Sequence, residues 1–258
     1  MIGLFGGYGQ FENMKFDRKI WLNWKTRKPC PRCESGLIVP PKEGGFVQSE
    51  TEDSKERNSY GDDYYSDYVF SLHLKCTNCN ETVVVSGKSI KENYPSDEEK
   101  GIQSSLVPVS FYPAPKIITI PKSCPKTVCK TLNESFGLYW LDISSCANKI
   151  RISIEVLLNE LKVRKRKQTR NVRKNLSLHE RIIEFKQTNN EVANYLLAIK
   201  WIGNAGSHYS DITKDNILDA YELVEYSLEL LYNDKKKKLV KMSKEIIKKK
   251  KPIKKKSP

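Results

Sequence analysis

Apolar residues recur at three- and four-residue steps through the second half of the chain, the spacing of one face of an α-helix. One such stripe, in a helix expected over residues 145–161, consists of Ile150, Ile154, Leu157, Leu158 and Leu161. Similar stripes predict helices over residues 125–140, 178–188, 191–203 and 214–233. Ser177 and Glu180 have the spacing of a capping box at the start of the third helix. The pattern therefore predicts an all-α domain over residues 123–234.

The first half of the chain has a strand pattern instead. Alternating and β-branched residues predict strands over residues 68–74 and 82–85. Between residues 34 and 75, acidic residues lie among Gly, Ser and Tyr with few aliphatic ones, which is typical of a solvated insertion. The prolines of residues 106–121 exclude a helix and predict an extended connector.

The expected fold class is α+β, with a small zinc-ribbon-like β module preceding a helical bundle. The β module, with its acidic insertion, is placed at residues 28–105, and the connector at residues 106–122. Residues 1–27 form an opening segment that is aromatic but not cleanly periodic.

Four cysteines form two C-x-x-C pairs, Cys30 with Cys33 and Cys76 with Cys79. Four thiolates at this spacing suit a tetrahedral Zn²⁺ site with no open position, which is a structural role. The alternatives are a disulfide pair or a redox-active C-x-x-C. The first ten residues lack a signal-peptide pattern, and the seven cysteines cannot all pair. Redox pairs usually begin a helix, whereas these lie in predicted hairpins. We therefore predict a structural zinc site in a reducing, cytoplasmic compartment.

The net charge of +14 is unevenly distributed along the 258 residues. Residues 235–258 contain thirteen Lys and one Glu, so the rest of the chain is almost neutral. This lysine-rich tail is expected to be disordered. It either attracts phosphate backbones or only keeps the protein soluble. No apolar run is long enough to cross a bilayer, so no membrane partner is expected.

A second basic run, without an acidic residue, follows the predicted helix over residues 145–161. Arginine suits phosphate, so this predicted loop is a candidate polyanion contact, and the alternative is a solvated connector between helices. The candidate phosphate-binding residues of this run are Arg164, Arg166, Arg170 and Arg173.

Trp201–His208 joins two helical stripes and places Asn204 and His208 four residues apart. Helical spacing would put the two side chains on one face, where they are candidate catalytic residues. The alternative is structural: Gly203 and Gly206 end a helix, Asn204 occupies a turn and His208 bonds a backbone carbonyl.

Several blocks of the second half resemble one bacterial family, in matching order and spacing. These blocks are residues 138–155, 177–182, 199–208 and 218–223. The family is the domain of unknown function 4145, itself similar to the HEPN helical superfamily. The resemblance covers about half of the chain. HEPN domains are small helical bundles, usually dimeric, and many are metal-independent ribonucleases of bacterial toxin and phage-defence systems. The resemblance thus implies a homodimer that acts on RNA.

The HEPN signature is an Arg, then a polar residue, then a His four to six residues beyond the Arg. Here Gly203 stands at the Arg position, while Asn204 and His208 match the other two. RNA cleavage by its own 2′-hydroxyl needs a base and a group that stabilises charge on the phosphate, so the missing cation matters. Lys200 and Arg151 are candidate replacements. The alternative for Arg151 is an intrahelical ion pair with Glu155.

The sequence therefore predicts a cytoplasmic zinc-binding protein whose HEPN-like domain binds or cleaves RNA, RNA being favoured over DNA. A role in phage defence or a stress response comes from the resemblance alone. The alternative is a non-catalytic interaction or dimerisation module, which the missing Arg favours.

Overall fold

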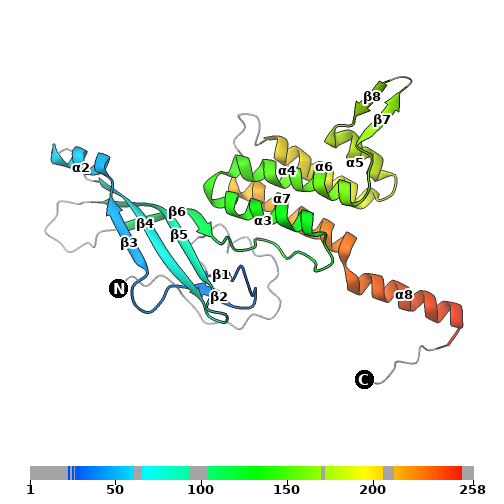
Figure 1. Ribbon diagram of the computed structural model, residues 1–258, viewed down its shortest axis with the longest axis horizontal. Helices are drawn as coiled ribbons and strands as arrows, with labels where there is room; N and C mark the ends of the chain where they lie inside the picture. Colours follow the sequence, from blue (N-terminus) through cyan, green and yellow to red (C-terminus); the bar gives the residue numbers. More distant parts are fainter. Residues whose placement is uncertain are drawn as a thin grey trace.

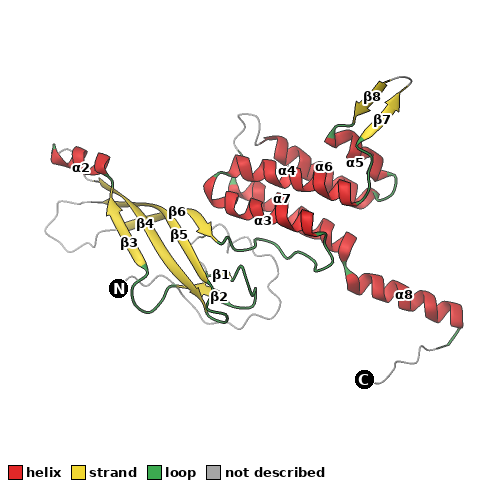
Figure 2. Cartoon of the chain, in the orientation of Figure 1, coloured by secondary structure: helices red, strands yellow, loops and turns green. Residues whose placement is uncertain are grey.

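The computed structural model describes residues 23, 25, 27–60, 65–92, 104–169, 172–205 and 212–251. It has an antiparallel β-sheet in the N-terminal half and a group of helices in the C-terminal half (Figures 1 and 2). The predicted α+β class, with a β module followed by a helical bundle, is confirmed. Every helix in the described ranges is too short or too polar to cross a bilayer.

The sheet has the strand order β1-β2-β4-β5-β6, and β3 also pairs with β4. The long β4–β5 hairpin forms its centre. Alternate side chains of these two strands, such as Leu72, Leu74, Val83 and Val85, are buried on one face. The strands are β1 (Lys28–Pro29), β2 (Leu37–Val39), β3 (Phe46–Glu50), β4 (Tyr65–Cys76), β5 (Thr82–Glu92) and β6 (Ser104–Tyr112). We call this sheet, with its turns, the β module.

Two segments of the β module differ from the sequence expectation. The expected connector begins with β6, which pairs with β5 through a register shift at Ser86/Gly87. Gly87 makes this pairing possible, because a Cβ there would lie 2.1 Å from the Val107 carbonyl oxygen. The acidic insertion contains β3 and the helix α2 (Glu52–Ser59), which is capped by Thr51. Local composition missed β3 and β6 because their backbone partners come from distant residues. The helix α2 was missed because its polar residues form no apolar stripe.

The helices lie close to the predicted ranges. They are α3 (Lys126–Leu141), α4 (Ile143–Glu160), α5 (Leu178–Lys186), α6 (Asn190–Ala205) and α7 (Lys214–Tyr232). We call these the helical bundle. Its core is aliphatic and aromatic, with one polar cluster in which Tyr221 donates to the Ser135 hydroxyl at 2.8 Å. The capping box of Ser177 and Glu180 is present. The apolar stripes thus determine this half of the fold locally.

Two basic segments are more ordered than expected. The run after α4 forms a hairpin of β7 (Arg166–Thr169) and β8 (Val172–Asn175) rather than a loop. The tail, expected to be disordered, is helical over α8 (Asp234–Lys249). Lys, Leu, Met and Glu are good helix formers, so their propensity competes with the charge repulsion on which the expectation rested.

The β module and the helical bundle meet at Trp140, near the end of α3. Its ring lies 4.4 Å from that of Phe111 in β6, centroid to centroid, and both side chains are buried. The buried ammonium of Lys28 in β1 lies 5.8 Å from the Trp140 ring centroid. Lys116 forms an ion pair with Glu34 of the first C-x-x-C turn. Aromatic packing and these cations therefore connect the two halves.

Candidate functional site

The four cysteines predicted as metal ligands come together at one end of the sheet. Their sulfur atoms all lie within 4.8 Å of one another. Cys30 Sγ is 3.7 Å from Cys79 Sγ, and Cys33 Sγ is 3.6 Å from Cys76 Sγ. With Zn–S bonds of about 2.3 Å, the edge of a tetrahedral site is about 3.8 Å. We call these residues the cysteine cluster, and its geometry can hold a structural zinc ion.

Two similar turns build the cysteine cluster. The residue after each pair, Glu34 or Asn80, has a φ of 58°, which turns the chain back toward the sulfur atoms. Backbone N–H groups then point at sulfur: Arg32 N lies 3.4 Å from Cys30 Sγ, and Asn78 N lies 3.3 Å from Cys76 Sγ. Such donors stabilise thiolates.

Gly36 allows the two turns to approach each other. A Cβ at this position would lie 2.5 Å from Cys76 Sγ. Its carbonyl oxygen accepts from Cys30 N at 2.8 Å, so the same residue also closes the first turn. The absent side chain is thus a steric requirement of the cysteine cluster.

The thiols of the cysteine cluster differ in acidity. Burial raises the pKa of the Cys30 thiol to about 12. A hydrogen bond from the Ser35 hydroxyl lowers the pKa of the Cys33 thiol to about 5. A cation bound to all four sulfur atoms would remove this difference, because coordination deprotonates thiols.

The predicted catalytic pair falls at the end of α6, where only Asn204 can be described. Asn204 lies in the last turn of the helix and is half-buried. His208 lies outside the described residues.

Gly203 in α6 lies against α4. A Cβ on Gly203 would lie 2.8 Å from Arg151 Cβ and 3.5 Å from Arg151 Cδ. The side chain of Arg151 therefore extends along the space beside position 203. This contact explains in steric terms why position 203 has no side chain.

The two candidate replacement cations have other partners. Arg151 Nη2 lies 3.2 Å from Glu155 Oε1, which is the intrahelical pair given as the alternative. Arg151 Nε is buried and has no hydrogen-bond partner among the described residues. The Lys200 ammonium lies 3.6 Å from the centroid of the exposed Trp201 ring, a cation–π contact.

The β7–β8 hairpin holds most of the other candidate phosphate contacts. It projects from the helical bundle beside α5 (Figure 1). Arg166 Nε donates to Asn175 Oδ1 at 3.1 Å, and Arg173 Nε donates to Gln168 Oε1 at 3.4 Å. Just before the hairpin, Arg164 Nε lies 2.6 Å from Glu184 Oε1. Arg170 lies outside the described residues. We call residues 164–175 the basic hairpin.

Arg181 in α5 anchors the basic hairpin and was missed by the sequence reasoning. It is buried, with 6 % of its surface exposed. Its guanidinium donates to the carbonyl oxygens of Arg164 and Val163, both at 3.2 Å, and to Asn159 Oδ1 at 2.8 Å. The sequence held a signal, because Arg181 falls on the apolar stripe of Leu178, Ile182 and Phe185. A cation on a buried stripe indicates a buried hydrogen-bonding role.

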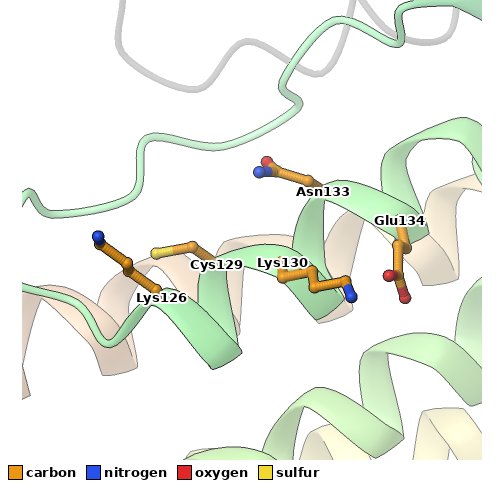
Figure 3. A pocket seen from close by; sticks show the side chains of 5 residues that line it. All are labelled: Lys126, Cys129, Lys130, Asn133 and Glu134. Carbon is orange, nitrogen blue, oxygen red and sulfur yellow. The ribbon is translucent and has the colours of Figure 1, made fainter.

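A shallow hollow on α3 contains none of these candidates. It is lined by Lys126, Cys129, Lys130, Asn133 and Glu134, which lie along one helix (Figure 3). Its rim includes the ion pair of Glu134 with Lys149 at 3.0 Å. The hollow is open and mostly built by one helix, so it does not mark a binding site.

Comparisons with known proteins agree with the division into two halves. Searches of curated proteins and of solved structures found no match. Residues 15–114 match the family model described as "Domain of unknown function (DUF8608)", which covers the β module. Residues 133–256 match the model described as "Domain of unknown function (DUF4145)", the family that the sequence blocks of this half resembled.

Proposed function

We propose that the protein binds RNA through the basic hairpin, on a scaffold that the β module stabilises. The observation that carries the proposal is an anchored ribbon with exposed cations. The side chains of Lys165, Arg166, Lys167, Arg173 and Lys174 are all exposed. Because Arg181 holds the base of the ribbon, these charges are presented on a fixed backbone.

The charge pattern of the basic hairpin suits a polyanion. Arginine and lysine neutralise phosphates and release counterions, which makes binding strong at low salt. Of the cations in the basic hairpin, Arg164 pairs with Glu184 at 2.6 Å, while Lys174 is 3.7 Å from Glu180 and its side chain is largely exposed. Exposed pairs of this kind are weak, so a phosphate can replace the carboxylate. The preference for RNA over DNA rests on the HEPN resemblance.

Charge reversal on the basic hairpin tests the proposal. We expect Lys167→Glu combined with Arg173→Glu to weaken binding of a labelled single-stranded RNA at least tenfold, measured by fluorescence anisotropy at several salt concentrations. The matched control is Lys122→Glu with Lys130→Glu, which changes two exposed lysines elsewhere by the same charge. Equal affinity of the two double variants would overturn the proposal.

RNA cleavage is a second candidate, favoured by one contact. The aliphatic part of the Arg151 side chain lies against Gly203, the residue before Asn204. In this hypothesis His208 removes the 2′-hydroxyl proton, and Asn204 and Arg151 stabilise the phosphate. We expect RNA cutting in EDTA that His208→Ala and Arg151→Ala abolish without lowering the melting temperature. Intact RNA with the unaltered protein would leave binding alone.

We also propose that the cysteine cluster holds one structural Zn²⁺. Four sulfur ligands fill the tetrahedron, so no position is open for a substrate or a water molecule. The ion would connect the β1–β2 turn to the β4–β5 turn at one end of the sheet.

The resemblance also suggests a homodimer and a role in phage defence or a stress response. A non-catalytic interaction or dimerisation module is the alternative function, and the pairing of Arg151 with Glu155 favours it over catalysis. Light scattering that gives a dimer, together with unchanged RNA affinity in the hairpin variants, would select this alternative.

A further inference from the structure

The helix α8 has a continuous apolar face that is exposed to solvent. At 100° per residue, its large apolar side chains fall within an arc of about 160°. Each of them is at least 40 % exposed: Leu239, Val240, Met242, Ile246 and Ile247. Ser243 lies in the middle of this arc, and its hydroxyl donates to the Val240 carbonyl oxygen at 3.0 Å. The Ser243 hydroxyl is therefore satisfied within the helix.

The opposite face of α8 is basic. Lys238, Lys241, Lys244, Lys248 and Lys249 lie on it and are exposed. Glu245 is the only acidic residue of the helix after Asp234. The helix thus combines a wide apolar face with a cationic one, which is the composition of helices that lie in a membrane interface.

The position of α8 leaves both faces accessible. The helix follows α7 after Asn233 and leads away from the helical bundle (Figure 1). Its 16 residues are about 24 Å long, less than the hydrocarbon thickness of about 30 Å that a spanning helix must cross. A membrane could therefore hold this helix only along its surface.

We propose that α8 binds the surface of an anionic lipid membrane. The helix lies in the plane of the interface, with the Leu239–Ile246 face among the acyl chains and the lysine face at the anionic headgroups. Charge complementarity identifies the occupant. A second copy of α8 would cover the apolar face but leave the lysine faces without an anionic partner, and a nucleic acid would engage the lysines but leave the apolar face in water. An anionic membrane provides acyl chains for the apolar face and anionic headgroups for the lysine face.

Vesicle binding by the full chain tests the proposal. The probes are vesicles of phosphatidylcholine alone and vesicles in which about a third of the lipid is phosphatidylglycerol. We expect cosedimentation with the anionic vesicles only. Leu239→Ser with Ile246→Ser should lower the partition coefficient at least tenfold, because the acyl-chain contact is lost. The triple variant Lys241→Gln, Lys244→Gln and Lys248→Gln should lower the partition coefficient by a similar factor. Added salt should then weaken the remaining vesicle binding less than it weakens binding of the unaltered protein.

Three controls separate this proposal from other uses of the helix. Ile183→Ser removes an exposed apolar side chain of α5 and should leave vesicle binding unchanged. The hairpin variant Lys167→Glu with Arg173→Glu should bind vesicles as the unaltered protein does. The two-serine variant of α8 should retain its RNA affinity and its melting temperature.

Several results would overturn the proposal. Equal binding to both vesicle types, or no binding to either, would contradict it. Vesicle binding that survives the two serine substitutions would also contradict it. Loss of self-association in that variant would identify a second copy as the occupant, and loss of RNA binding in the lysine variant without vesicle binding would identify a nucleic acid.

Discussion

The β module and the helical bundle are held together by different kinds of interaction. In the β module the two cysteine turns meet around a group of sulfur atoms, and Gly36 makes room for them. In the helical bundle, large side chains such as Phe136, Leu132 and Ile154 fill a continuous core. A metal ion bound by the cysteine cluster would cross-link the two turns of the β module, whereas a bundle of five helices relies on apolar burial. The two halves should therefore respond differently to the same perturbations.

Loss of metal should give the largest difference in stability between the β module and the helical bundle. We expect about one zinc ion per chain, and we expect Cys76→Ser to lose it and open the β module around the cysteine cluster. The binding free energy of a structural zinc site is about 10–16 kcal/mol in model peptides, enough to decide whether the module folds. Metal analysis combined with limited proteolysis should show cleavage in the β module and a protected helical bundle. Cys129→Ser, outside the cysteine cluster, is the control, and a folded metal-free β module would refute the zinc site.

Truncating a core side chain of the helical bundle should destabilise that half and leave the β module intact. Phe136 is 1 % exposed, and its ring lies 5.4 Å from that of Tyr221, centroid to centroid. We expect Phe136→Ala to lower the free energy of unfolding of the helical bundle by about 3–5 kcal/mol, in urea denaturation. The zinc content should remain that of the unaltered protein. Loss of zinc in this variant would mean that the two halves fold as one unit.

Lys28 links the two halves and should make stability depend on pH. Burial lowers the pKa of its ammonium to about 7, below the ordinary value of 10.5. The unfolded chain therefore binds more protons than the folded one between pH 7 and pH 10.5, so stability should rise with pH in this window. The rise should be a few kcal/mol, at about 1.4 kcal/mol per pKa unit. The check is the difference in urea stability between the unaltered protein and Lys28→Met across these pH values, and parallel curves would contradict it.

A pair of alanine substitutions should give the smallest effects. Gly36→Ala brings a methyl group against a cysteine sulfur atom, and Gly203→Ala brings one against Arg151. We expect each to lower the free energy of unfolding by about 1–3 kcal/mol, because the backbone or its neighbour must move. Competition with a chelator should show weaker metal binding for Gly36→Ala only. Equal metal affinity in both variants would mean that the cysteine cluster tolerates a Cβ at position 36.

Sequence patterns predicted the helices better than the strands. The stripe of Ile150, Ile154 and Leu158 predicts α4 directly, because helical hydrogen bonds connect residues four apart. In β6, the partners of Leu106 and Pro108 are Ser89 and Gly87, which lie 17 and 21 residues away in the sequence. A window around the prolines contains no information about that pairing. The strand β3 likewise pairs with residues 68–72 of β4, whereas the helix α2 was hidden because its polar residues form no apolar stripe.

The candidate sites also differ in whether the sequence could predict them. The spacing of the two C-x-x-C pairs predicted that the four cysteines would cluster, since this is the ligand type and spacing of tetrahedral zinc sites. The meeting of Arg151 with Gly203 was not visible, because it depends on how closely α4 and α6 approach. The anchoring of the basic hairpin by Arg181 likewise depends on α5 packing beside the end of α4.

The amino-acid sequence alone determined the positions of the helices in the bundle, the four sulfur ligands and the two concentrations of positive charge. These features depend on neighbours a few residues apart or on composition. Only the tertiary structure decided that one basic run is a hairpin fixed by a buried guanidinium and that the other carries an exposed apolar face. The physical reason is that anchoring and exposure depend on which distant surfaces come into contact, and local spacing does not encode such contacts.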